Sequence, residues 1–226
     1  MIYDNIVKAK LLTRENRFIA HILVNGKEEV CHVKNTGRCR ELLIPNAEIY
    51  VQTNNDPKRK TKFSLIAVNK GGRLINMDSQ APNKAVEEWL KSGGLFSDIV
   101  NLKREKTFQN SRFDMYFERG GKKCFMEVKG VTLENDNIVS FPDAPSERAV
   151  KHLKELQIAH SMGYETYVLF IVQMSDVKYF EPNAENHKAF AEELKQAKAS
   201  GVNILAYDCE IEPNSMVIRK PVQVLV

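Results

Sequence analysis

Two acidic residues, Asp114 and Glu127, flank a short segment whose pattern predicts a β-hairpin, and Lys129 follows the second acid. The segments on either side are rich in aromatic and β-branched residues, as strands are, and Gly120-Gly121 supplies a tight turn between them. A hairpin centred on these glycines places Asp114 opposite Glu127, and Lys129 returns to their face because strand side chains alternate. The spacing therefore predicts two carboxylates and an ammonium group on one surface.

Opposed carboxylates repel each other unless a positive charge lies between them. Oxygen ligands suit Mg²⁺ or Mn²⁺, which keep several waters and can bind a phosphate as well. A lysine beside such a metal can orient or help deprotonate water and can neutralise charge on the phosphate. We therefore predict a metal site with Asp114, Glu127 and Lys129 as catalytic residues in attack on a phosphodiester. The alternative is a surface hairpin in which Lys129 alone neutralises the two acids.

The acid-x-Lys tripeptide is weak support by itself, because it occurs four times in the chain. Asp56-Pro57-Lys58 lies in a polar turn, Asp176-Val177-Lys178 follows an apolar strand, and Glu193-Leu194-Lys195 belongs to an exposed helix. Only Glu127 combines a strand setting with an acidic partner across a turn.

Length and composition indicate a protein of the cytoplasm. The chain of 226 residues can form one large or two small domains. It shows no apolar run of membrane-spanning length and no signal-peptide pattern at its beginning. Its four cysteines and five histidines are scattered without metal-binding spacing, which favours reduced thiols over disulfides or a zinc site.

The net charge of +4 is unevenly distributed along the chain. Residues 1–80 contain 14 Lys and Arg against 8 Asp and Glu, whereas residues 81–226 contain 19 against 21. This asymmetry suggests that the first part binds a polyanion while the second carries acidic chemistry, although basic surfaces also serve solubility.

The first eighty residues predict a small closed β-barrel such as the oligonucleotide-binding (OB) fold. The predicted strands are Ile6–Leu12, Arg17–Val24, Glu28–Val33, Glu48–Thr53 and Phe63–Asn69. Basic residues gather at the turns, where they can contact phosphates without reading bases. These predicted nucleic-acid-binding residues are Arg14, Arg17, Arg38, Arg40, Lys58, Arg59, Lys60 and Lys62. The alternative for the run at 58–62 is a solvated loop tip.

The remainder of the chain predicts an α/β domain with a mixed sheet. Residues 78–83 have the composition of a domain boundary, and Asn83 is a candidate cap for the helix that follows. A later helix has a candidate cap at Asp143, with Pro145 at its start. The expected elements are helix 83–92, strands 99–108, 111–118 and 123–129, a hairpin around 134–137, helix 146–162, strand 164–173, helix 187–199 and strand 202–207.

Longer strings in the chain resemble those of the sugar fermentation stimulation protein A (SfsA) family, and the resemblance spans nearly the whole sequence. The strings are Asn35-Thr36-Gly37-Arg38, Ser111-Arg112-Phe113-Asp114, residues 127–133, Phe141-Pro142-Asp143-Ala144-Pro145, Ser146-Glu147-Arg148, Lys151-His152-Leu153, Val168-Leu169-Phe170 and Phe180-Glu181-Pro182-Asn183.

The resemblance implies an OB-fold domain over residues 1–80 and a domain similar to the PD-(D/E)xK nucleases over residues 81–226. It also implies DNA binding and a role in regulating sugar metabolism genes. The nuclease motif corresponds here to Asp114, Glu127 and Lys129, and the Val128 carbonyl corresponds to an additional metal ligand of that superfamily. Among the acids of the preceding helix, Glu88 best matches the family pattern.

The helix after residue 145 carries Arg148, His152 and Glu155 on one stripe. In nucleases of this fold the equivalent helix packs beside the active site, so the resemblance makes Arg148 or His152 a candidate phosphate contact. An exposed polar stripe is the other interpretation. Asp143 is a further candidate, ranked below the hairpin residues.

Three functions remain open at the sequence level. The first is a DNA-binding regulator, with DNA in single-stranded form as one option, on a nuclease scaffold that holds Mg²⁺ or Mn²⁺. The second is an active Mg²⁺-dependent deoxyribonuclease, and the third is an RNA- or small-molecule-binding protein. The sequence leaves the oligomeric state open, a homodimer included, and a fold alone cannot choose among functions.

Overall fold

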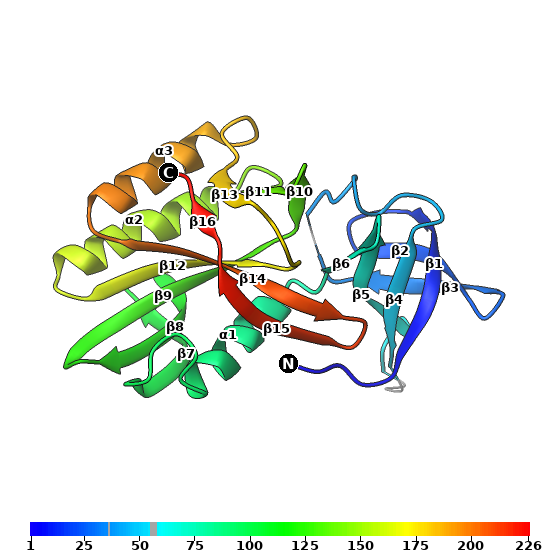
Figure 1. The fold of residues 1–226 in the computed structure, drawn as a ribbon, viewed down its shortest axis with the longest axis horizontal. Coiled ribbons are helices and arrows are strands. Elements are labelled where there is room, and N and C mark those ends of the chain that lie inside the picture. Colours follow the sequence, from blue (N-terminus) through cyan, green and yellow to red (C-terminus); the bar gives the residue numbers. More distant parts are fainter. Residues whose placement is uncertain (36, 55–57) are drawn as a thin grey trace.

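The computed structural model describes residues 1–35, 37–54 and 58–226 as two domains joined side by side (Figure 1). The first is a barrel whose strand order is β3-β2-β1-β4-β5-β6, and parallel pairing of β3 with β5 closes it. Its strands are β1 (Ile6–Arg14), β2 (Ile19–Val24), β3 (Lys27–Val33), β4 (Glu48–Thr53), β5 (Phe63–Lys70) and β6 (Arg73–Asn76). The predicted barrel is confirmed, but β6 was not expected. The polar turn predicted at Asp56-Pro57-Lys58 includes residues 56 and 57, which lie outside the described part of the chain.

The second domain is built on a mixed sheet of order β15-β14-β12-β9-β8-β7, in which β12 is parallel to both β9 and β14. The elements of this sheet are β7 (Val100–Phe108), β8 (Ser111–Arg119), β9 (Lys122–Val131), β12 (Glu165–Val172), β14 (Asn203–Glu212) and β15 (Ser215–Pro221). A smaller sheet contains β10 (Leu133–Asn135), β11 (Ile138–Phe141), β13 (Tyr179–Pro182) and β16 (Gln223–Val224). Strands β13, β15 and β16 were not expected from the sequence.

Helices cover both faces of the large sheet. The helices are α1 (Ala81–Lys91), α2 (Glu147–Ser161) and α3 (Lys188–Ala199). On β12, Leu169 packs in a cluster with α1, whereas Val168 and Phe170 pack in the cluster that contains α2 and α3. A strand covered on both faces is apolar at every position, which explains the continuous apolar run at 167–172. None of the described helices is long and apolar enough to cross a membrane.

Two predicted helix caps are wrong. Helix α1 begins at Ala81 after Gln80, with Pro82 in its first turn, so Asn83 lies inside the helix. Proline is accommodated there because the first helical residues need no N–H partner within the helix. Helix α2 is capped by Ser146, whose hydroxyl accepts a hydrogen bond from the Ala149 N–H at 3.3 Å, and not by Asp143.

A buried polar network joins the two domains next to the boundary predicted at residues 78–83. The Gln173 side-chain amide donates to the Asn76 carbonyl at 3.0 Å, to Asn76 Oδ1 at 2.9 Å and to the Asp78 carbonyl at 3.2 Å. Asn76 and Gln173 are each 1% exposed. These bonds join the end of β6 to the residue after β12, so the junction is held from both domains.

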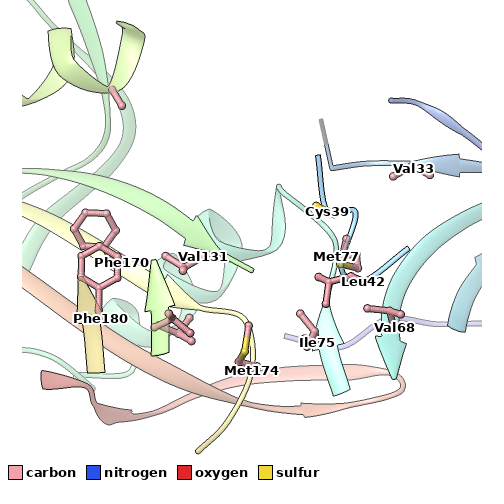
Figure 2. Packing of buried hydrophobic residues seen from close by; sticks show 14 of the residues in the cluster. Val33, Cys39, Leu42, Val68, Ile75, Met77, Val131, Phe170, Met174 and Phe180 are labelled. Carbon is pink, nitrogen blue, oxygen red and sulfur yellow. The ribbon is translucent and has the colours of Figure 1, made fainter. Parts of the chain in front are cut away.

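A second contact across the boundary combines charge with apolar packing. Lys70 on β5 donates to Glu134 on β10 at 2.6 Å, and Arg73 lies 3.4 Å from the same carboxylate. Figure 2 shows buried residues of one cluster on both sides of the boundary, among them Phe170 in the second domain and Ile75 in the barrel. The two domains therefore share a continuous core.

Replacement of Gln173 by leucine should destabilise the protein, because it removes the three hydrogen bonds that the Gln173 amide donates to buried oxygens of residues 76 and 78. We expect the free energy of unfolding to fall by about 1–3 kcal/mol, measured by urea denaturation. Gln196→Leu on the exposed face of α3 is the matched control, with a change within about 0.5 kcal/mol. Equal stabilities of the two variants would contradict this role for the network.

Candidate metal and phosphate site

The β8–β9 hairpin has the register that the spacing predicted. Gly120 and Gly121 both have positive φ, +50° and +76°, and Arg119 pairs with Lys122 across them. Such a conformation suits a two-residue turn whose twist matches that of the strands. The ladder continues to Met115, which pairs with Met126. The next residues on the two strands are the two acids, so the turn brings Asp114 and Glu127 together.

Asp114 is held between a strand and a helix. Its Oδ2 accepts the Val128 N–H at 2.8 Å, and its Oδ1 accepts the Asn83 side-chain amide from α1 at 2.8 Å. The carboxylate thus takes the position of a backbone acceptor beside β9. Since the N–H and C=O of one strand residue point to the same side, the Val128 carbonyl also faces this position.

Asn83 was missed as a site residue, because the sequence suggested only a capping role. Asn83 is the third residue of α1, and packing of that helix on the sheet brings its side-chain amide to Asp114. Nothing in the local sequence gives that distance.

Glu127 is almost completely buried, at 3% exposure. Its Oε1 accepts from Lys129 Nζ at 2.6 Å and from His152 Nδ1 on α2, whereas its Oε2 is buried without a hydrogen-bond partner among the described residues. Burial alone would raise the pKa of Glu127, but the Lys129 ammonium and the His152 ring outweigh it and hold the pKa below its ordinary value. Glu127 is therefore a carboxylate with one free, desolvated oxygen.

The pKa of Asp114 is shifted in the opposite direction, to about 6 from 3.8. Burial is the main cause and the neighbouring Glu127 carboxylate adds to it, while the bonds from Val128 and Asn83 oppose the shift. The pKa values of the two carboxylates in this desolvated site are thus shifted in opposite directions, a pattern typical of functional sites.

Helix α2 brings two predicted residues to the hairpin. Arg148 Nε donates to His152 Nε2 at 3.4 Å, and His152 Nδ1 contacts Glu127. Because an arginine remains protonated, its bond assigns the acceptor role to Nε2, so the Nδ1–H is directed at Glu127. His152 is 4% exposed, whereas Arg148 lies at the surface. The polar stripe expected on this helix thus faces the site, at least through these two residues.

Two other candidates lie elsewhere. Glu88, with its side chain 48% exposed, pairs with the α-ammonium of Met1 at 3.0 Å, and no contact joins it to the hairpin acids in the described part of the chain. Asp143 accepts the Cys39 N–H at 3.1 Å and so lies against a barrel loop. The structure places Asp143 at the domain boundary.

The predicted basic residues of the barrel have different surroundings. Arg14 donates to the carbonyls of Arg17 at 3.2 Å and Gly37 at 3.0 Å, among others, and thereby organises the loop after β3. Arg59 donates to Asn54. The remaining members are exposed at the surface and are Arg17, Arg38, Arg40, Lys58, Lys60 and Lys62.

The residues at the hairpin fit a divalent cation that prefers oxygen. The Asp114 carboxylate, the Val128 carbonyl and the Glu127 carboxylate, whose Oε2 has no partner among the described residues, form an all-oxygen set, which suits Mg²⁺, Mn²⁺ or Ca²⁺ with waters completing the shell. The described residues contain no cluster of three or more His, Cys, Asp or Glu able to hold a metal. A site made by two acids and one carbonyl is consistent with that finding.

A barrel closed by β1–β5 and extended by β6, joined to a mixed-sheet domain with paired acids on a central hairpin, defines the class: an OB domain followed by a restriction-endonuclease-like domain. Residues 12–77 match the model of the SfsA N-terminal OB domain, and residues 80–215 match that of the sugar fermentation stimulation protein RE domain. The chain therefore belongs to the SfsA family.

Similar proteins support this assignment over the full length. The sugar fermentation stimulation protein homolog of Clostridium beijerinckii is 58% identical and covers 100% of both chains. The homolog of Desulfitobacterium hafniense is 56% identical over 96% of this chain and 94% of its own. The solved structure of Pyrococcus furiosus SfsA in complex with Ca²⁺ matches with a TM-score of 0.91 and 27% identity, covering 100% of this chain and 98% of that one.

The raised pKa of Asp114 predicts a pH-dependent stability of the metal-free protein. The folded state holds this proton more tightly than the unfolded chain, so the stabilisation is complete below pH 3.8 and is lost as the pH rises to about 6. Relative to Asp114→Asn, the wild type should lose about 3 kcal/mol between pH 3 and pH 7.

Urea denaturation across this pH range, with a chelator present, measures the difference. The Asn variant also loses an acceptor, but that loss adds a constant offset and leaves the slope interpretable. Asp4→Asn, at an exposed position, is the control and should follow the wild type. Parallel curves for wild type and Asp114→Asn would show that the shift is absent.

Proposed function

We propose that this protein binds DNA and holds a divalent cation, Mg²⁺ or Mn²⁺ in the cell, at Asp114, Glu127 and the Val128 carbonyl. The observation that carries the proposal is the buried Glu127 Oε2, which none of the residues that the structure describes satisfies, beside a second carboxylate whose pKa is raised. A desolvated oxygen of this kind is costly unless a cation or water satisfies it. The Ca²⁺ bound by the P. furiosus relative supports the same conclusion.

The chain's own residues fix the site before any ligand arrives. Asn83 and the Val128 N–H orient Asp114, while Lys129 and His152 orient Glu127. Orientation by neighbouring groups is what a functional site requires to keep its geometry. A bound divalent cation would neutralise the two acids and act as a Lewis acid toward a phosphate oxygen.

DNA is the proposed partner because basic groups lie on the barrel side of the acidic site. Arg38 and Arg40 are exposed on the loop after β3, and Arg148 is exposed beside the site itself. Phosphate contacts of this kind position a nucleic acid without reading its sequence, so binding should weaken steeply with salt. Regulation of sugar metabolism genes would require only such binding, without turnover.

Phosphodiester hydrolysis is the second candidate function, and Lys129 favours it. Its ammonium lies 2.6 Å from Glu127 Oε1 and its side chain is 16% exposed, so it is directed into the site and not to bulk water. An ammonium in that position can orient a water or stabilise charge on the attacked phosphate. RNA or a small molecule is a further ligand class for the barrel. Failure to bind or cleave DNA would favour that class over DNA.

Metal binding should stabilise the folded protein. With Ca²⁺ at about a hundredfold excess over its Kd, linkage gives about 2.7 kcal/mol, or roughly 5–10 °C in Tm. Glu127→Ala should abolish that shift, whereas Glu212→Ala, which removes an exposed carboxylate of β14, should retain it. Differential scanning calorimetry with and without Ca²⁺ measures it. An equal shift in Glu127→Ala would place the metal elsewhere.

DNA cleavage decides between the two candidate functions. Labelled single-stranded, duplex and branched DNAs are incubated with wild type and Mg²⁺ or Mn²⁺, and products are resolved on a denaturing gel. For an enzyme, Lys129→Ala should lower the rate by a factor of about 10² or more. The control Lys188→Ala, whose side chain is 82% exposed on α3, should cleave normally. Salt-sensitive binding without products would support the regulator, and absence of both binding and cleavage would refute the DNA proposal.

A further inference from the structure

A cleft of about 330 Å³ lies between the two domains. The barrel contributes Arg17, Asn35 and Gly37 to its lining, and the second domain contributes the start of α2 and residues that follow β9 and β12. The lining also includes Gly130, the residue after Lys129. The cleft therefore adjoins the metal and phosphate site while reaching the barrel.

The position of the cleft in the sheet is one at which α/β proteins bind ligands. Strands β9 and β12 are parallel, and their last residues, Val131 and Val172, are paired. Val131 and Gln173 line the cleft, which thus lies outside the carboxyl ends of two adjacent parallel strands. Crevices in this position are the usual ligand sites of such sheets. Figure 1 shows that this end of the sheet faces the barrel.

A glycine permits close packing at the floor of the cleft. A Cβ on Gly130 would lie 2.4 Å from Gln173 Oε1 and 2.9 Å from Pro82 Cγ, so a larger residue does not fit. Gln173 is 1% exposed, and its amide nitrogen is fully engaged with residues 76 and 78. Its Oε1 is consequently held over Gly130 as a fixed acceptor at the cleft.

The groups around the cleft suit one nucleotide of a polynucleotide strand. Arg17 is exposed and is the cation of the lining, whereas the acid of the lining, Asp143, is engaged by the Cys39 N–H. An arginine can hold a backbone phosphate, and a fixed amide oxygen can accept from the edge of an unpaired base. The volume of the cleft is at the lower end of the range for small-ligand sites, and a DNA duplex does not fit into it.

We propose that this inter-domain cleft seats an unpaired nucleotide of the DNA strand bound at Asp114 and Glu127, which makes a single-stranded end the preferred substrate class. The inference rests on the proposed DNA-binding function and specifies its substrate. A DNA strand that runs past Lys129 would next meet Gly130 and then the side of the barrel that carries Arg17. Blunt duplex DNA can contact the surface arginines outside the cleft, Arg38, Arg40 and Arg148, but cannot enter the cleft where Arg17 lies.

Fluorescence anisotropy with labelled oligonucleotides in Ca²⁺ tests the inference. The probes are a blunt duplex, the same duplex with a single-stranded overhang, and the single strand alone. Wild type should bind the overhang probe more tightly than the blunt duplex. Arg17→Ala should weaken overhang binding roughly five- to tenfold, the loss expected for one phosphate contact, and leave blunt-duplex binding unchanged.

Ala144→Trp is a second, independent variant because it fills the cleft without removing a charge. It should reduce overhang binding by at least the same factor. The matched controls are Lys27→Ala, an exposed barrel cation outside the cleft, and Ala184→Trp, on an exposed loop outside it. Circular dichroism and thermal melting check that each variant is folded, and Arg17→Ala alone suffices if Ala144→Trp does not fold.

Two outcomes overturn the inference and are distinguishable. If wild type binds DNA but the cleft variants bind the overhang probe as it does, or lose affinity equally for all three probes, the cleft is not a nucleotide site. If wild type binds none of the probes, the proposed DNA-binding function itself fails and the inference fails with it.

Discussion

The turn of the β8–β9 hairpin fixes which residue of one strand lies beside which residue of the other, and the site depends on that register. With Gly120 and Gly121 at the turn, the ladder from Arg119 to Met115 brings Asp114 beside β9. A shift of one residue would move every side chain of the strand to the other face. Asp114 would then lose the Val128 N–H, and the acids would separate. The positive φ angles of Gly120 and Gly121 thus determine which side chains of β8 and β9 meet at the site, about 20 Å further along the strands.

Burial of Glu127 is the second constraint, and it follows from the first. Covering the sheet with α2 removes this carboxylate from water, which is costly for a charge unless partners replace the solvent. Lys129 and His152 supply partners for one oxygen, and no residue in the described part of the chain supplies one for the other. The site is therefore neither a neutralised ion pair nor a solvated acid. The incompletely hydrogen-bonded Glu127 carboxylate distinguishes this site from a surface hairpin in which lysine alone neutralises the acids.

Local patterns predicted the features that are encoded locally. The paired glycines and alternating residues gave the hairpin, and the apolar run gave the central strand, because turn conformation and burial depend on nearby residues. The role of Asn83 and the contact of Glu88 with Met1 depend on how α1 packs on the sheet, which no spacing specifies. Strands β13 and β16 are short and pair with segments distant in the chain, so their pairing partners define them more than their composition does.

Contacts at the junction between the domains fix the position of the barrel relative to the acidic site. Gln173, which joins the domains through Asn76, also forms part of the cleft beside Gly130. The ion pair between Lys70 and Glu134 is a second polar connection between the domains. The two domains also share one apolar core. Two separate polar connections across a continuous core oppose rotation of one domain against the other, unlike the small polar interfaces that permit domain motion. The barrel and the acidic hairpin are thus held at a fixed separation, and a ligand that spans both meets a surface already in its binding geometry, which lowers the entropic cost of association.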